Sequence, residues 1–256
     1  MLNFNDSRSK LFFEFVRLLK EIKPKYFLLE NVKMKKEWQD IITRELWVEP
    51  IEINSSLVSA QNRRRLYRTN IPSISQPKDK GILLKDILQE NVDEKYYLSE
   101  SAIKTLNREF GSKWRLYENT DVKANTLTAS MWTGGGNVPA LIEFVGGILK
   151  IRQATKQWYI VAHEWDGISL AYPNSKTRRG RVIHQKSNTI TTEWESYAYS
   201  DSRIRKLTPI ECERLQTLPD NYTEWVSDSQ RYKMLWNWWT VDVIAHIFSF
   251  IPKQNG

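Results

Sequence analysis

The sequence predicts an α/β fold, because helical and strand patterns alternate along its first part. Apolar residues recur every three or four positions up to about Glu21, as they do on one face of a helix. The run at residues 26–29 is short and apolar and ends abruptly in Glu30 and Asn31, which is typical of a buried strand whose polar end opens into a site. A second helical pattern follows at 38–46, and strand patterns follow at 48–54 and 66–71.

The first helix has recognisable start and stop signals. Asp6 or Ser7 can cap its N-terminus, and Pro24 ends it because proline has no N–H to donate. Its apolar positions are expected to face the sheet, and they are Leu11, Phe12, Phe15, Leu18, Leu19 and Ile22.

The middle of the chain has a different character. The segment 72–81 has no periodicity and carries two prolines, which predicts a linker. From residue 82 to about 203 the sequence holds short strand patterns, loops and scattered aromatic side chains, so we expect a mostly irregular or β part there.

Helical patterns return near the end of the chain. Thr208, Pro209 and Glu211 have the spacing of a capping box with proline in the first turn, and the helix that they start contains Cys212. A last helix at 240–250 is expected to present one apolar face, made of Val241, Ile244, Ala245 and Phe248.

Composition limits the classes of protein to consider. The 256 residues suffice for one good core, with or without a second small domain. The formal charge of +8 fits a polyanion such as DNA, although many basic soluble proteins have a similar charge. The single cysteine, Cys212, excludes an intramolecular disulfide and fits a reducing cytosol. No apolar run reaches the ~18 residues that span a bilayer, and we find no signal-peptide pattern and no metal motif, so we expect a cytoplasmic protein without a membrane partner.

Polar residues collect where two of the predicted strands meet. Glu30 and Asn31 follow the first strand, and a cluster of an amide pair and three arginines at 61–65 precedes the strand at 66–71. Ligands of open α/β sheets bind beyond the carboxyl ends of strands. A carboxylate and a guanidinium cluster therefore predict a polar pocket at this place.

These motifs carry a resemblance to a known family. Glu-Asn-Val at 30–32 and Gln-x-Arg-x-Arg at 61–65 resemble two core motifs of the DNA cytosine-5 methyltransferases. The segments DSRSKLFFEF, RKLTPIECERLQTLPDNYT and RYKML with TVDVIAHI are similar to further family motifs, in the same order along nearly the whole chain.

The resemblance implies the fold and its division. The fold would be the second half of a Rossmann-like sheet that uses S-adenosylmethionine, with an inserted, mostly irregular or β target recognition domain. Residues 1–75 and 204–256 would form the catalytic domain, and residues 76–203 would form the target recognition domain.

The resemblance also implies the reaction, which is methyl transfer from S-adenosylmethionine to C5 of cytosine in a specific sequence of double-stranded DNA. Addition of a cysteine thiolate to C6 pushes charge onto N3 and O2 of the base. Glu30 would serve N3, and Arg65, supported by Arg63, would serve O2. Leu11 and Asn237 lie in segments that the family places beside the methyl donor. Capping of a helix by Glu30, phosphate binding by Arg63 and plain packing of Leu11 are the alternatives.

The recognition part contains a repeated pattern. The hexapeptides KANTLT at 123–128 and KSNTIT at 186–191 echo each other, beside a glycine loop and an arginine run. Basic, hydroxyl and amide groups suit phosphate and base contacts, while a solvated charge run is the alternative. The expected DNA contacts are Lys123, Thr126, Thr133, Gly135, Arg178, Arg179, Arg181 and Thr189.

Two family motifs are not found in the sequence. There is no Phe-x-Gly-x-Gly donor loop and no Pro-Cys nucleophile, and Cys212 lies in a helix where the family carries none. The resemblance thus implies a truncated or split methyltransferase that needs a complementary fragment or subunit with both motifs. A noncatalytic DNA-binding remnant, and an unrelated Rossmann-like enzyme, are the alternatives.

Three tryptophans stand where the family usually has glycine. They are Trp47, Trp236 and Trp238, and the last two flank Asn237 and would obstruct donor binding. One hypothesis is that these positions are UGA codons, translated here as tryptophan but decoded as glycine in the source.

Overall fold

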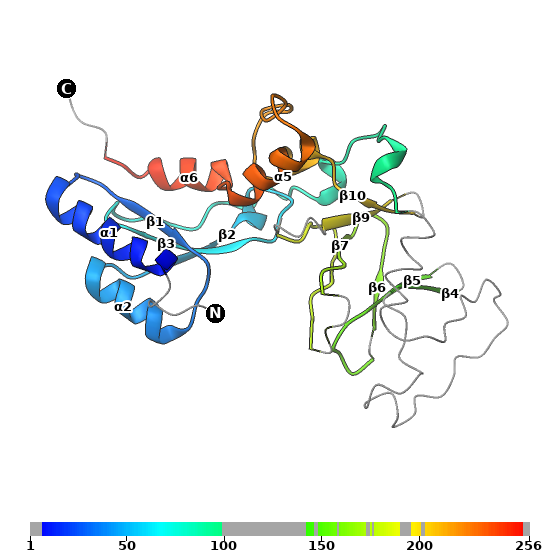
Figure 1. Ribbon diagram of the computed structural model, residues 1–256, viewed down its shortest axis with the longest axis horizontal. Helices are drawn as coiled ribbons and strands as arrows, with labels where there is room; N and C mark the ends of the chain where they lie inside the picture. The colour runs from blue at the N-terminus through cyan, green and yellow to red at the C-terminus, as the bar shows by residue number, and fades with distance from the viewer. Residues whose placement is uncertain are drawn as a thin grey trace. The chain divides into compact units, whose positions relative to one another are not determined.

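The structure is a computed structural model that describes residues 7–98, 142–145, 148–157, 159–172, 175, 177–189, 196–200 and 203–252. The chain forms two compact units. The first unit comprises Met1–Ser55, Arg64–Lys78 and Asp242–Gly256, and the second comprises Ser56–Arg63 and Asp79–Val241. Figure 1 gives the labels of the elements along the chain.

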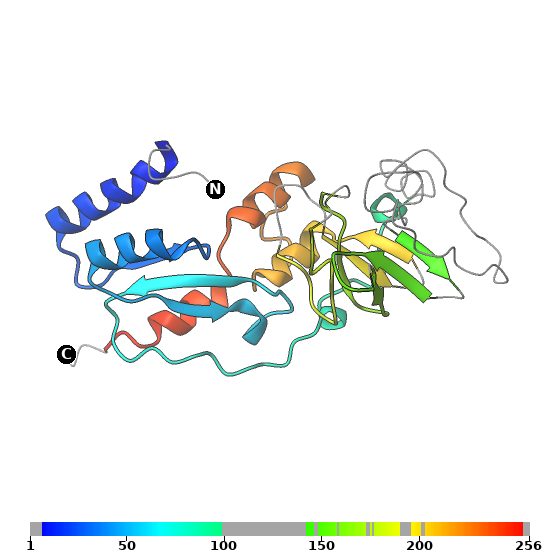
Figure 2. The same cartoon turned by 90° about the horizontal axis from the view of Figure 1, so that it is seen from below.

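The first unit is built on a three-stranded antiparallel sheet in the order β1-β3-β2. Its strands are β1 (Leu28–Asn31), β2 (Ile51–Asn54) and β3 (Arg64–Thr69). Figures 1 and 2 show the helices α1 (Ser7–Ile22) and α2 (Lys36–Leu46) on one face of this sheet, and α6 (Val241–Phe248) on the other. The predicted helices and strands of this part are therefore confirmed. The bounds of each strand differ from the predicted ones by a few residues.

The helix α1 buries only part of its predicted apolar face. Val16 is buried against Ile42 and Leu46 of α2, and Phe12, Phe15 and Leu19 pack around them. Leu11, Leu18 and Ile22 are exposed, so the prediction that they face the sheet is wrong. An apolar stripe can be wider than the contact that covers it, and periodicity does not reveal how much is covered.

The helix α6 buries part of its predicted face, since Ile244 is buried and Val241 packs against an apolar cluster. Val243, Ile244 and Ile247 are buried, whereas Ala245 and Phe248 are exposed. The helix is apolar at most positions, so two overlapping stripes fit the same sequence. Nε2 of His246 also donates a hydrogen bond to the carbonyl of Ser75 at 2.8 Å, which ties α6 to the segment after β3.

The second unit contains two antiparallel sheets. One has the order β4-β5-β6 and the other has the order β10-β9-β7-β8. Their apolar residues meet in one cluster that includes Leu149, Ile151, Ile168 and Ile204. The bounds of the strands are Ile142–Val145, Ile148–Arg152, Tyr159–Ala162, Gly167–Ser169, Val182–Ile183, Ser196–Ser200 and Arg203–Lys206, for β4 to β10 in order.

Helices and short turns complete the second unit. The helices are α4 (Pro209–Leu215) and α5 (Asp228–Asn237), and the 3₁₀ turns are η1 (Ser55–Leu57), η2 (Leu84–Asp86) and η3 (Glu94–Tyr96). Apolar side chains from these elements form a second cluster around Leu84, Cys212, Leu215, Tyr232 and Leu235.

The predicted capping box of α4 is confirmed. The N–H of Glu211 donates to the hydroxyl of Thr208 at 3.2 Å, and the N–H of Thr208 donates to the Glu211 carboxylate at 2.8 Å. The same carboxylate accepts hydrogen bonds from Nη1 and Nη2 of buried Arg205, at 2.8 and 2.7 Å. A buried charge needs such a partner, so this pair fixes α4 to β10.

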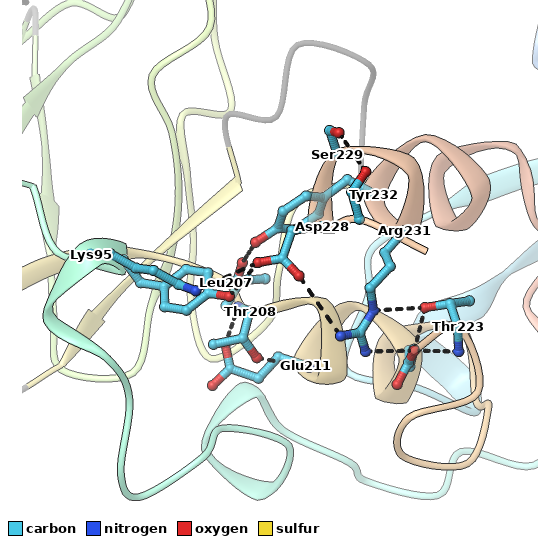
Figure 3. A network of polar contacts seen from close by, with 12 residues as sticks. Lys95, Leu207, Thr208, Glu211, Thr223, Asp228, Ser229, Arg231 and Tyr232 are labelled. Carbon is cyan, nitrogen blue, oxygen red and sulfur yellow. Dashed lines mark hydrogen bonds and ion pairs between the residues drawn. The ribbon is translucent and has the colours of Figure 1, made fainter. Parts of the chain in front are cut away.

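The helix α5, which the sequence did not predict, is held by polar contacts (Figure 3). Arg231 reaches the buried Glu213 of α4 at 3.0 Å. The hydroxyl of Tyr96 donates to Asp228 at 3.0 Å, and the hydroxyl of Tyr232 donates to the carbonyl of Leu207 at 2.6 Å. Burial and the nearby Asp228 raise the pKa of Tyr96 to about 12, so its hydroxyl stays a donor at neutral pH.

The compact units cut across the predicted domain boundaries. Helices α4 and α5 belong to the same unit as the region 82–203, because their apolar faces share a cluster with Leu84 and Ala198. The assignment of residues 1–75 and 204–256 to catalysis and of 76–203 to recognition concerns function, and it stays a prediction.

Candidate active site

Strand pairing brings Glu30 and Arg65 together in the first unit. The strands β1 and β3 are antiparallel with Asn31 opposite Leu66, so the start of β3 lies beside the end of β1. The Nε of Arg65 lies 2.9 Å from Oε1 of Glu30, and the two side chains are 14% and 17% exposed. This pairing agrees with the sequence prediction of a carboxylate and a guanidinium at one strand edge.

The contact between Glu30 and Arg65 is close but not aligned as a hydrogen bond, since Oε1 of Glu30 has no aligned donor. One nitrogen of the Arg65 guanidinium also donates to the carbonyl of Arg64, at 2.9 Å. Both charged groups can therefore exchange this contact for a better one with a ligand. A carboxyl group suits a ring nitrogen and a guanidinium suits a carbonyl oxygen, as on one edge of a pyrimidine.

Arg63, the middle residue of the Gln-x-Arg-x-Arg motif, belongs to the second unit. Its side chain is buried, and Nη2 donates to the carbonyl of Trp238 at 3.3 Å. The motif is thus divided, with Arg65 beside Glu30 in one unit and Arg63 on the loop Ser56–Arg63 of the other.

The two predicted cofactor residues are both exposed and lie on different helices. Leu11 is 66% exposed on α1. Asn237 is exposed at the end of α5, and its amide donates to the carbonyl of Lys233 at 3.0 Å. Trp236 and Trp238 are half-buried and pack against the apolar cluster around Cys212. The contacts of Leu11 and Asn237 with S-adenosylmethionine stay predictions.

Two of the predicted DNA-binding arginines are not fully buried. Arg179 is exposed and donates from Nε to the carbonyl of Ala154 at 2.9 Å. Arg178 is half-buried, donates to the hydroxyl of Ser169 at 3.1 Å and lies over the ring of Tyr172. The exposed Arg179 is open to a phosphate, and the DNA contacts of both residues stay predictions.

Arg181 has a different environment. Its side chain is buried and donates to the carbonyls of Ala171 and Tyr172, both at 2.9 Å, and to that of Ser169 at 3.3 Å. These bonds hold the loop after β7. Because they use its guanidinium inside the protein, Arg181 is not part of the DNA contacts that we propose.

Thr189 also bonds within the unit, because its hydroxyl donates to the carbonyl of Asn62 at 2.8 Å. The remaining predicted DNA contacts lie outside the described residues, and they are Lys123, Thr126, Thr133 and Gly135.

Cys212 is unsuited to nucleophilic attack. It is buried within α4 and has no disulfide partner. Burial raises the pKa of its thiol far above the ordinary value, and the charges of Glu211 and Glu213 raise it further. The thiolate is the reactive form of cysteine, so this environment disfavours attack by Cys212. The burial that the sequence predicted for Cys212 is confirmed.

Sequence reasoning missed a carboxylate that organises the loops of the sheet β10-β9-β7-β8. We call this sheet the recognition sheet, because most of it lies in the region predicted to recognise DNA. Asp166 is buried and accepts from the N–H groups of His163 and Gln185, at 2.8 and 2.9 Å. It also lies 2.8 Å from Nδ1 of His184. The signal in the sequence is weak, since the only hint is an aspartate before Gly167 at the start of a short strand.

Within the described ranges, no helix is long and apolar enough to cross a membrane. The same ranges hold no group of three or more histidine, cysteine, aspartate or glutamate side chains that could bind a metal ion.

Comparison with known proteins agrees with these features. The family model for C-5 cytosine-specific DNA methylases matches residues 1–48 and 53–253. The orphan methyltransferase M.SPRI of Bacillus phage SPR is 28% identical over 98% of this chain and 80% of its own length. The type II methyltransferase M.HpaII of Haemophilus parainfluenzae is 28% identical over 99% of this chain and 67% of its own length.

Solved structures share the fold. The Dnmt2 methyltransferase of S. pombe has a TM-score of 0.52 at 14% identity and covers 98% of this chain and 73% of its own. A putative DNA modification methyltransferase encoded within an E. coli prophage has a TM-score of 0.52 at 17% identity, with 96% and 74% covered. These likenesses confirm the predicted α/β fold of a Rossmann-like methyltransferase, and the division into catalytic and recognition parts stays a prediction.

Proposed function

Because the chain belongs to the C-5 cytosine-specific DNA methylases, we propose that it binds the target base and the surrounding sequence in a DNA cytosine-5 methyltransferase. The observation that carries this proposal is the loosely aligned pair of Glu30 and Arg65 at the strand edge. The methyl group comes from S-adenosylmethionine, which supplies an electrophilic methyl when it is bound. Relatives from bacteria and phages support a cytoplasmic place of action.

The chemistry assigns a separate task to each member of the pair. A target cytosine inside a duplex is out of reach, so it must first be flipped out of the stack. Attack of a thiolate on C6 then places negative charge on N3 and O2. Glu30 relieves the charge at N3 by a proton or hydrogen bond, and Arg65 relieves it at O2. The supporting role of Arg63 at O2 stays a prediction, because its guanidinium donates to the Trp238 carbonyl within the second unit.

The thiolate has to come from outside residues 1–256. Cys212 is the single cysteine of the sequence and it is buried. A further segment of the same protein or a separate chain with a donor loop and a Pro-Cys motif would meet this need. In the second unit, the exposed Arg179 supports our proposal that residues 76–203 set the sequence preference.

Tritiated-methyl incorporation into DNA tests the proposal. The chain alone should transfer no methyl group, and addition of a fragment with the donor loop and Pro-Cys should restore transfer. Glu30→Gln should then lower the rate by ~10²–10⁴-fold and leave DNA binding intact, since it removes acid–base help at N3. Glu14→Gln is the matched control, because Glu14 pairs with Arg17 on the exposed face of α1.

Three results would count against this proposal. Unchanged transfer by the Glu30→Gln complex would remove Glu30 from the chemistry. Transfer by the chain alone that disappears in Cys212→Ala would make Cys212 the nucleophile. Sequence-specific DNA binding without transfer, even in the complemented complex, would favour the noncatalytic remnant.

A further inference from the structure

The loop Ser56–Arg63 carries Arg63 and is paired with a segment of the recognition part. The N–H of Ser187 donates to the carbonyl of Ala60 at 2.8 Å, and the N–H of Asn62 donates to the carbonyl of Ser187 at 3.0 Å. Gln61 and Ser187 thus form a parallel bridge. All of these residues belong to the second unit, although the strands on both sides of the loop belong to the first.

Lys186 is next to this bridge, and its ammonium group donates to backbone carbonyls of the same unit. Its Nζ donates to the carbonyls of Ser56 and Ser59, both at 3.3 Å, and to the carbonyl of Ile82. An ammonium group has three N–H donors, so these three carbonyls occupy all of them. Two of the three lie on the loop that ends in Arg63.

The backbone of Lys186 is fixed from the opposite side. A Cβ on Gly167 would lie only 2.2 Å from the carbonyl oxygen of Lys186, so the strand β7 and this residue are in direct backbone contact. The adjacent carbonyl of Gln185 accepts from the N–H of Leu84 at 2.7 Å. Lys186 is therefore anchored to the recognition sheet at one end and to the loop at the other.

The environment of the ammonium group fits an internal role. Burial lowers the pKa of Lys186 from its ordinary range, and the nearby carboxylates of Asp79 and Asp86 act in the opposite direction. Removing the ammonium would take a donor from three partly buried carbonyl groups, which is costlier than losing an exposed contact.

We infer that Lys186 is a positioning residue that holds the loop carrying Arg63 against the recognition sheet, and that its ammonium does not contact DNA phosphate. The inference rests on the proposed function, because it gives that loop a task in binding the target base. It changes the interpretation of the KSNT segment, whose Lys186 and Thr189 both bond to the loop. DNA contacts made by the recognition sheet are then coupled directly to the position of Arg63.

Hydrogen exchange of the chain tests the positioning role. Lys186→Met should speed exchange of the Asn62 and Ser187 amides at least ~10-fold through local opening, and leave the amides of β1 to β3 unchanged. Lys186→Arg, which keeps the charge and the donors, should restore most of the protection. Lys85→Met is the control, since Lys85 is exposed in the same unit. Unchanged exchange in Lys186→Met, or equal acceleration at all amides, would overturn the inference.

Salt dependence of DNA binding tests the second half of the inference. Loss of one phosphate contact lowers the slope of log K against log salt by ~0.9, so Arg179→Gln should show this decrease and Lys186→Met should not. An equal decrease in both variants would make Lys186 a DNA contact. A wild-type chain that binds no DNA would count against the proposed function, while the exchange experiment would still decide the positioning role.

A kinetic measurement separates positioning from simple stability. In the complemented enzyme, Lys186→Met should lower kcat at least ~10-fold and change KM for DNA less than ~3-fold, because misplaced groups slow the chemical step more than they weaken binding. A fall in thermal stability with unchanged kcat would reduce Lys186 to a structural residue. Lys186→Gln replaces the methionine variant in all three experiments if that variant does not fold.

Discussion

At the scale of single residues, Trp47 has a left-handed backbone that is unfavourable for its side chain. It caps the C-terminus of α2 with φ 56° and ψ 27°, and its N–H donates to the carbonyl of Thr43 at 2.7 Å. Glycine is the usual residue at such a left-handed cap, because a Cβ is strained there. The indole gains little in return, since Trp47 is 88% exposed. The geometry is that of a glycine position, which agrees with the codon hypothesis.

Trp47→Gly should therefore raise the free energy of unfolding by about 1 kcal/mol, which is the cost of the left-handed conformation for a residue with a Cβ. Trp236→Gly is the contrasting variant, because Trp236 packs against the core cluster and its loss should destabilise by ~3 kcal/mol. Urea denaturation measures both. A loss of stability in Trp47→Gly would refute the argument, and the intact mass of the protein from its natural source would show which residue it carries.

At the scale of elements, the recognition sheet depends on one close backbone approach. Gly167 lies in β7, and any Cβ there would meet the carbonyl of Lys186 at 2.2 Å and the Cα of Ser187 at 2.8 Å. Backbone atoms cannot move aside as a flexible side chain does. The sheet and the segment behind it must separate if the position is filled.

Gly167→Ala should lower the free energy of unfolding by ~1–3 kcal/mol through overpacking. It should also speed amide exchange at Ser187, whose N–H bonds to the loop. Gly180→Ala is the matched control, because Gly180 has open space around it and a φ of 66°. This substitution lowers the free energy of unfolding only by the cost of placing a Cβ in the left-handed conformation. Equal melting temperatures for Gly167→Ala and the wild type would show that the close approach does not exist in solution.

Local signals in the sequence predicted some elements well and missed others for physical reasons. The capping box at Thr208 was correct because a cap is decided by a few neighbouring residues. The helix α5 was not predicted, because groups outside it hold it in place. Arg231 of α5 pairs with Glu213, and Asp228 of α5 accepts from Tyr96. The pairing of Glu30 with Arg65 could be predicted from the order of motifs and strands. That Arg63 belongs to the second unit could not be predicted, because its contact with Trp238 joins residues more than a hundred positions apart in the sequence.

At the scale of the whole molecule, the recognition region does not end where its sequence pattern ends. The chain passes between the two units four times, after Ser55, Arg63, Lys78 and Val241. The loop Ser56–Arg63 is the shortest of these pieces, and it bonds to Ser187 and Thr189. A transplanted recognition region therefore needs this loop with it.

Exchange of residues 76–203 for the same region of a related enzyme should move the methylated site in the complemented complex. Exchange of 56–63 together with 76–203 should move the site and keep a higher rate, because the bonds of Lys186 and Thr189 stay matched. Bisulfite sequencing reads the site and methyl incorporation reads the rate. An unchanged site in both chimeras would show that the sequence preference lies elsewhere.

The division of the loop from its flanking strands has a consequence for the order of folding. Asn54 and Arg64 pair across β2 and β3 and are close in sequence, so this hairpin can form early. The hydroxyl of Thr189, in contrast, finds the carbonyl of Asn62 only after a loop of 127 residues has closed. We expect pulse-labelled amides of β3 to become protected before that of Asn62, so that the hairpin exists first and its tip is the last part to be built.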